Sequence, residues 1–198
     1  MKALVLCEES GVVRDAFASV GFDSWSCDLE PSRASGQHMQ MDAQFALRSA
    51  QWDIVIAHPP CTYLCNSGVR WLKGNEDRQA ELKKAGMFFR LLMDYCQKNK
   101  IPSAFENPIP HKYAVACIGR KYDQLIQPWQ FGHGETKATC LWLEGLPGLK
   151  PTNIVEGRES RIHKMAPSAT RSRDRSVTYQ GIADAMAQQW GSFVKDKS

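Results

Sequence analysis

Short apolar runs that each stop at a polar or reactive residue constrain the fold of this chain more than any other feature. Four such runs cover residues 2–7, 22–28, 52–57 and 101–108. Segments with the apolar spacing of amphipathic helices separate them, at residues 12–21, 41–51 and 77–99. Strands that alternate with helices in this way predict an α/β fold with a doubly wound, mostly parallel sheet.

The rhythm changes after residue 120. Residues 127–145 predict two antiparallel strands around the glycine-rich turn 132–135, a pair that would close the sheet. Residues 181–196 have the spacing of a final amphipathic helix.

The size and composition of the chain predict one domain over residues 1–198. A chain of 198 residues with 43% hydrophobic content can bury one full core. No signal peptide is evident, and no apolar run approaches the roughly 20 residues that a membrane helix needs. Seven widely spread cysteines indicate reduced thiols, so we expect a cytoplasmic protein with no membrane partner.

Positive charge gathers between residues 158 and 175, where six Lys or Arg residues stand against two acids. We refer to residues 158–175 as the basic segment. The segment can be a solvated surface loop or a loop that contacts phosphates, and the sequence leaves both open.

The strand ends carry the residues with chemistry. In doubly wound sheets ligands bind outside the carboxyl ends of the strands. The first strand leads into a loop with one glycine, Gly11, and the second ends at Asp28, which suits the ribose hydroxyls of a nucleoside cofactor. An acid in that place also often caps a helix. A single glycine argues against a dinucleotide.

Cys61 follows two prolines at the end of the most apolar strand. As metal ligands, Cys61, Cys65 and His58 lack the spacing of a zinc deaminase, so we expect no metal. Glu106 ends the next long strand and should lie on the same edge of the sheet. An exposed cysteine beside a carboxyl is an arrangement for covalent catalysis.

Pro-Pro-Cys at residues 59–61 followed by Glu-Asn-Pro at 106–108 resembles the DNA cytosine-5 methyltransferase family. The segment 6–22 resembles the family's first S-adenosylmethionine (SAM) motif, and 181–191 resembles its last helix. The resemblance implies a Rossmann-like SAM-dependent methyltransferase that acts on cytosine in DNA.

The resemblance also implies the roles of individual residues. Cys61, held by the turn at Pro60, would add to C6 of the pyrimidine so that C5 can take the methyl group. A protonated Glu106, with its pKa raised by burial, would hydrogen-bond N3, and Asn107 would orient the loop. The cofactor-binding residues would be Cys7, Glu8, Ser10, Gly11, Asp28, Leu29, Asp42, Pro59 and Ala183. The substrate-binding residues would be Thr62, Tyr63, Lys137, Arg171, Arg173 and Arg175.

The chain departs from the family at three places. Cys65 stands where the family often has serine, and we expect it to be a packing substitute for that serine. In a later motif the family has arginines that contact the base, and only Lys137 and His133 are present there in this chain. Glu8 and Glu9 occupy a loop that is usually built from small residues.

The largest departure is a missing target-recognition region, whose interval is reduced to residues 144–177. Arg171, Arg173 and Arg175 would line a phosphate track if this interval is extended. We expect low sequence selectivity or a partner subunit. Duplex DNA, single-stranded DNA and a free pyrimidine nucleotide all stay open as substrates.

Two aromatic residues near Cys61, Tyr63 and Trp71, are candidates for contacts with a base. Residues 69–76 are a candidate for a lid over the site. Trp129, Trp142 and Trp190 are expected to pack the core. His111 and His133 are expected to be surface or helix-capping groups.

Two other functions are compatible with the same strand ends. An amino-methyltransferase holds an exocyclic amine at a Pro-Pro turn and needs no cysteine. A non-catalytic module of the same fold would bind DNA or a partner as half of a split methyltransferase.

Overall fold

The computed structural model describes residues 1–166, 168 and 171–197, and it has a seven-stranded sheet with the order β3-β2-β1-β4-β5-β7-β6. The five strands β1 to β5 are parallel, and β7 runs antiparallel between β5 and β6. The strands are β1 (Lys2–Leu6), β2 (Asp23–Asp28), β3 (His38–Gln40), β4 (Ile54–Ala57), β5 (Ser103–Pro108), β6 (Gln124–Ile126) and β7 (Thr139–Glu144). The predicted doubly wound, mostly parallel α/β sheet with an antiparallel pair is therefore confirmed.

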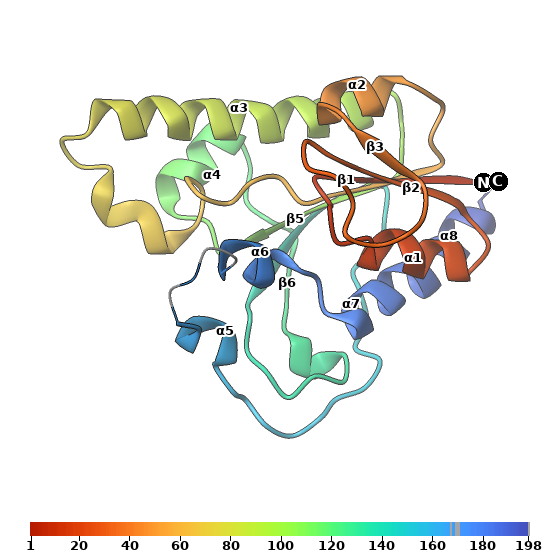
Figure 1. The fold of residues 1–198 in the computed structure, drawn as a ribbon. Coiled ribbons are helices and arrows are strands. Elements are labelled where there is room, and N and C mark those ends of the chain that lie inside the picture. Colours follow the sequence, from red (N-terminus) through yellow and green to blue (C-terminus); the bar gives the residue numbers. More distant parts are fainter. Residues whose placement is uncertain (167, 169–170, 198) are drawn as a thin grey trace.

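Helices cover both faces of the sheet (Figure 1). One face carries α1 (Val12–Ser19), α7 (Gln180–Ala185) and α8 (Gly191–Lys195). The other carries α2 (Ala43–Arg48), α3 (Glu76–Lys98) and α4 (Lys112–Ile118).

Alternation along the central strands explains why both faces are covered. In β1, Ala3 and Val5 pack toward α1, whereas Leu4 and Leu6 pack toward α3, and all four are buried. Side chains of a strand alternate between faces, so an uninterrupted apolar run requires cover on both sides. Trp142 and Trp190 are fully buried, as expected.

Several elements differ from the sequence prediction. The strand β3 and the helix α4 were not predicted. The first antiparallel strand is β6, which precedes the predicted range, and a 3₁₀ turn (Pro128–Gln130) occupies the predicted position. Pro128 has no N–H group to donate to a strand, and its fixed φ favours the start of a helical turn.

The basic segment is helical where an extended loop was expected. It contains α5 (Arg161–Lys164) and α6 (Arg171–Ser176). An α-helix turns about 100° per residue, so Arg171 and Arg175 share one face of α6 and Arg173 points elsewhere. The three arginines therefore do not alternate along an extended strand, which was the condition for the predicted phosphate track.

The last helix contains an irregularity. A π-helical turn (Met186–Trp190) joins α7 to α8, and Trp190 donates from Nε1 to the Pro147 carbonyl at 2.8 Å. A π turn holds one residue more than an α-helical turn does.

Among the described residues, no helix is long and apolar enough to cross a membrane.

Candidate active site

The turn after β4 is tied to both neighbouring strands. The His58 N–H donates to the Leu6 carbonyl of β1 at 2.9 Å. On the other side, the amide Nδ2 of Asn107 donates to the Pro59 carbonyl at 2.6 Å, and Asn107 is buried. The structure thus brings the Pro-Pro-Cys turn and the Glu-Asn-Pro strand end together, and Asn107 holds the Cys61 turn rather than the loop that carries Glu106.

Glu106 lies beside His58, a residue that the sequence reasoning considered only as a metal ligand. His58 Nδ1 and Glu106 Oε2 are 3.0 Å apart, and both side chains are largely buried. The carboxylate accepts, so Nδ1 carries the hydrogen. The position of His58 directly before Pro-Pro, at a strand end, was the signal that it belongs to the site.

The pKa of Glu106 is lowered. Burial opposes the charged form, but the hydrogen bond from His58 and the positive charges of His58 and Lys137 outweigh it. The expectation of a raised pKa is therefore wrong, and the reason is that its neighbours are cationic groups rather than only apolar ones.

Lys137 lies at the site as predicted. It is close to Glu106 and Cys61, and burial lowers the pKa of its ammonium. Its Nζ donates to the Val177 carbonyl at 3.1 Å. With Glu106, it lines a small pocket beneath the start of α7, together with Thr139, Thr178, Tyr179, Ile182 and Met186.

Cys61 and Cys65 form a thiol pair. The Cys61 carbonyl accepts from the N–H groups of Leu64 and Cys65 at 3.0 and 3.1 Å, which places both cysteines on one turn. Their side chains are hydrogen-bonded to each other, and Cys65 Sγ lies 3.0 Å from Ser67 Oγ. Cys65 is therefore a hydrogen-bonding partner of Cys61 rather than a packing substitute for serine.

The two cysteines have opposite pKa shifts. The bond from Cys61 lowers the pKa of Cys65 to about 5. The same bond, burial and the negative charge of Glu106 raise the pKa of Cys61. Cys61 thus holds the proton at rest, and Cys65 is the adjacent group that can take it.

The loop after β1 uses its first glutamate for structure. Glu8 is buried and accepts from the backbone N–H groups of Val13 at 2.7 Å and Arg14 at 3.2 Å, and Ser10 Oγ donates to it at 3.2 Å. Glu8 therefore caps α1. The sequence assigned Glu8 and Ser10 to a cofactor, whereas these contacts of both side chains serve the start of the helix.

Gly11 allows the tight entry into α1. Its φ is +78°, and a Cβ there would lie 2.5 Å from the buried guanidinium of Arg14. A side chain at this position would be strained by both the backbone and the contact. Gly11 therefore shapes the loop.

Three predicted cofactor residues converge beside this loop. Burial raises the pKa of the Cys7 thiol, and the nearby charges of Asp28 and Asp42 add to the shift. Asp28 also accepts from the Glu30 N–H at 3.0 Å, and Asp42 caps α2 by accepting from the Gln44 N–H at 2.7 Å. The two carboxylates thus lie near Cys7 at the carboxyl end of β1, beside the reversal of strand order between β1 and β4.

Other predicted residues are exposed or lie in the core. Ala183 is fully buried against α1, so packing is the role that the structure shows, and Leu29 is 69% exposed. Thr62 is exposed, and Tyr63 is half-buried, with the Arg78 guanidinium 5.1 Å from its ring centroid.

The arginines of the basic segment bind mostly to the protein itself. Arg173 makes a bidentate pair with Glu9, with distances of 2.6 to 3.0 Å, and Arg161 binds Glu135 at 2.9 Å. Glu9, the second loop glutamate, therefore faces α6 rather than a cofactor.

Histidines outside the site act as caps. His111 Nδ1 accepts from the Ala114 N–H and caps α4, and His133 Nε2 accepts from the Gly181 N–H. His111 is buried rather than on the surface.

Among the described residues, no group of three or more His, Cys, Asp or Glu side chains is placed to hold a metal ion.

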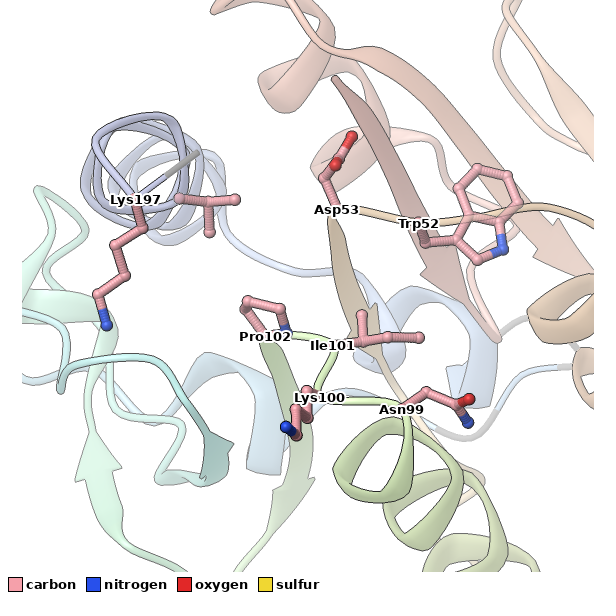
Figure 2. A pocket seen from close by; sticks show the side chains of 8 residues that line it. Trp52, Asp53, Asn99, Lys100, Ile101, Pro102 and Lys197 are labelled. Atoms are coloured by element: carbon pink, nitrogen blue, oxygen red, sulfur yellow. The ribbon is translucent and has the colours of Figure 1, made fainter.

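One cavity lies away from these residues. Figure 2 shows it at the amino ends of the strands, where Asp53 precedes β4 and Pro102 precedes β5, with Lys197 on its far side; its volume is about 270 Å³. The candidate site occupies the opposite edge of the sheet, so this cavity is not part of it.

Comparisons with known proteins find likenesses among solved structures. No family model matches the chain, and no curated protein matches it. A crystal structure of a prophage-encoded E. coli protein, assigned as a DNA modification methyltransferase, is 15% identical over 84% of this chain, with a TM-score of 0.49. The match covers 55% of that protein, so this chain spans about half of its length.

Proposed function

We propose that the chain transfers a methyl group from SAM to C5 of a pyrimidine, with cytosine in DNA as the expected target. The observation that carries the proposal is the bond from Asn107 to the Pro59 carbonyl, because it fixes the Cys61 turn beside the Glu106–His58 pair. Three groups then lie at the carboxyl edge of the sheet: Cys61 as the nucleophile, Cys65 as its proton acceptor and Glu106 for the ring nitrogen.

The residues at the carboxyl end of β1 suit a nucleoside cofactor without phosphates. The carboxylates of Asp28 and Asp42 suit the hydroxyl and amine donors of such a molecule. Glu8 already accepts from the first N–H groups of α1, so the helix end that commonly binds phosphate is occupied by a carboxylate. Asp28, Asp42 and Cys7 would hold SAM, which when bound supplies an electrophilic methyl group.

The turn holds the groups for the nucleophilic step. Cys61 passes its proton to Cys65 as its sulfur forms the S–C6 bond; the resting pKa directions oppose this transfer, and formation of the S–C6 bond must drive it. The electron pair of the C5–C6 double bond becomes available at C5, which would then take the methyl group that SAM supplies. Water accepts the C5 proton, and the Cys61 sulfur departs and takes its proton back from Cys65, which restores the ring and the thiol pair.

The Glu106–His58 pair supports the ring nitrogen. As sulfur adds to C6, N3 gains negative charge. Because Glu106 rests as a carboxylate, the Glu106–His58 pair must take up one further proton before it can donate to N3.

The first test is binding of SAM and S-adenosylhomocysteine by calorimetry. We expect micromolar binding that Asp28→Ala abolishes and Asp94→Ala, an exposed acid on α3, leaves unchanged. A folded protein that binds neither compound, with or without DNA, would contradict the cofactor assignment.

The second test is transfer of a labelled methyl group to DNA. Cys61→Ser should lower the rate by at least about a thousandfold, since it removes the nucleophile. Cys65→Ser should retain more activity, because serine can still bond Cys61 but is a poorer proton acceptor. Full activity of Cys61→Ser would indicate an exocyclic amine as the methyl acceptor, and a binding module would show no transfer at all.

A further inference from the structure

Two exposed aromatic rings flank the Cys61 turn. Trp71, at the end of a 3₁₀ helix (η1, Asn66–Trp71), is 57% exposed, and Tyr113, in the first turn of α4, is 50% exposed. Large aromatic side chains are normally at least largely buried, so two exposed rings beside a candidate site call for an explanation.

Each ring has a cation beside it. The Arg70 guanidinium carbon is 4.7 Å from the centroid of a Trp71 ring, and Lys112 Nζ is 5.0 Å from that of Tyr113. None of the ion pairs among the described residues involves Arg70, Lys73 or Lys112. These charges are thus not neutralised by carboxylates of the protein.

Contacts of the start of η1 and of the segment before α4 tie the segments that carry the rings to the reactive turn. Cys65 and Pro110 form an antiparallel bridge, and the Asn66 N–H donates to the Ile109 carbonyl at 3.1 Å. His111 Nε2 lies 2.9 Å from the Tyr63 carbonyl, and the His111 and Tyr113 ring centroids are 6.0 Å apart. The segments that carry the rings therefore have a fixed relation to Cys61.

The opposite flank of the site contrasts with this surface. In the basic segment Arg161 and Arg173 bind carboxylates, and Arg158 donates to the Val155 carbonyl and lies over the Trp129 ring at 3.9 Å. These cations, which the sequence offered for phosphates, are engaged within the protein.

We propose that the surface formed by η1 and the start of α4 binds single-stranded DNA, with bases that neighbour the target stacked on Trp71 and Tyr113. This rests on the proposed function and names its substrate as a single strand. Arg70, Lys73 and Lys112 meet the phosphates. Exposed rings can stack bases only where those bases are unpaired, and stacking beside cations is how sequence-tolerant single-strand binding works.

A single strand also agrees with the small recognition region. Extruding a base from a duplex costs a few kcal/mol, and a single strand avoids this cost. The interval 144–177 offers little additional surface to offset it.

The test is fluorescence anisotropy with a labelled cytosine-containing 12-mer, as a single strand, as a duplex and as RNA of the same sequence, without SAM. We expect the single DNA strand to bind at least tenfold more tightly than the duplex or the RNA. Trp71→Ala should weaken single-strand binding about tenfold, and Tyr113→Ala somewhat less.

Matched controls separate the surface from general effects. Phe45→Ala removes a ring that is 70% exposed on α2, and Lys83→Gln removes an exposed cation on α3. Neither should change binding, whereas Arg70→Gln and Lys112→Gln should weaken it and reduce its salt dependence. Thermal unfolding checks that every variant is folded.

The outcomes distinguish this proposal from the proposed function. Equal binding of duplex and single strand, preferred binding of RNA, no binding of any oligonucleotide, or no effect of Trp71→Ala would each overturn the single-strand surface. Methyl transfer in the labelled assay would then stand by itself. Conversely, single-strand binding that depends on Trp71 without any methyl transfer would support the surface and overturn the reaction.

Discussion

The turn after β4 and the basic segment both bring charged side chains to the carboxyl edge of the sheet, but different forces hold them there. Glu106 and Asn107 belong to β5, and their partners lie on the turn that continues β4, so backbone pairing positions them. Helix α6 is held by ion pairs of the Arg173 side chain with the side chains of Glu9 and Glu30, without backbone pairing. Buried bonds are little affected by salt, whereas exposed ion pairs are screened.

The comparison shows which contacts fix the positions of charged side chains and which do not. Exposed ion pairs contribute roughly 0–1 kcal/mol, while breaking a buried bond leaves an unsatisfied group at about 1–3 kcal/mol. The reactive groups are therefore positioned before any ligand arrives, and the position of α6 depends on ionic conditions.

Replacing the buried carboxylate should have the largest effect on stability. Glu106→Gln is expected to lower the free energy of unfolding at pH 7 by about 1.5–3 kcal/mol, because a hydrogen bond to a charged group is lost. The folded-state pKa of Glu106 lies below its ordinary value of 4.5, so its contribution is present above that pH and is lost as the pH falls through the folded value. Urea unfolding from pH 3 to 7 measures this.

Glu135→Gln is the control for that experiment. The pKa of Glu135 is also lowered: burial opposes the shift, but bonds from Tyr179 and Arg161 outweigh it. Arg161 is exposed, so the effect of Glu135→Gln should shrink in 1 M salt, whereas that of Glu106→Gln should persist. Equal salt sensitivity of the two variants would contradict the contrast between the regions.

The bond between Asn107 and Pro59 should come next. Asn107→Ala is expected to cost about 1–3 kcal/mol, since it leaves the buried Pro59 carbonyl without this donor. Asn99→Ala, at the exposed end of α3, should cost less than about 1 kcal/mol. Thermal unfolding at low and high salt would show whether the loss at Asn107 is independent of ionic strength, and a loss that disappears in salt would sink this account.

The smallest effect is expected for the ion pair of α6. Arg173→Gln should cost at most about 1 kcal/mol at low salt and nothing measurable in 1 M salt. The informative measurement is protease cleavage within the basic segment, which should accelerate in the variant and, with salt, in the wild type. Unchanged cleavage in both would indicate that other contacts hold α6.

The sequence predicted the sheet and the meeting of its strand ends because both follow from local patterns. Short apolar runs define β1, β2, β4 and β5, and the parallel arrangement brings Cys61, Glu106 and Asn107 to one edge. The short elements β3 and α4 escaped prediction, since three to seven residues carry too little periodicity to distinguish them from loop.

Side-chain partners were harder to predict than strand ends. The pKa of Glu106 depends on His58 and Lys137, and Lys137 is far from Glu106 in the chain. Glu8 was assigned to a ligand because its loop looked like a cofactor loop, yet its partners are the backbone N–H groups of α1. Which partner a side chain binds depends on distances in the folded protein, and these distances cannot be read from spacing in the sequence.

The π-helical turn at Met186–Trp190 has a consequence for how the chain tolerates changes in length. A π turn in a continuous helix accommodates one extra residue while the helical faces before and after it keep their relative orientation. Ile182 on α7 and Val194 on α8 therefore face the same core across the irregularity.

Deletion of exposed Gln188 would remove this extra residue and leave a regular α-helix with both faces still aligned. A one-residue deletion inside any other turn of that helix would rotate everything beyond it by about 100° and expose Trp190 or Val194. The π turn therefore marks a place along the last helix where one residue can be lost without rebuilding the core.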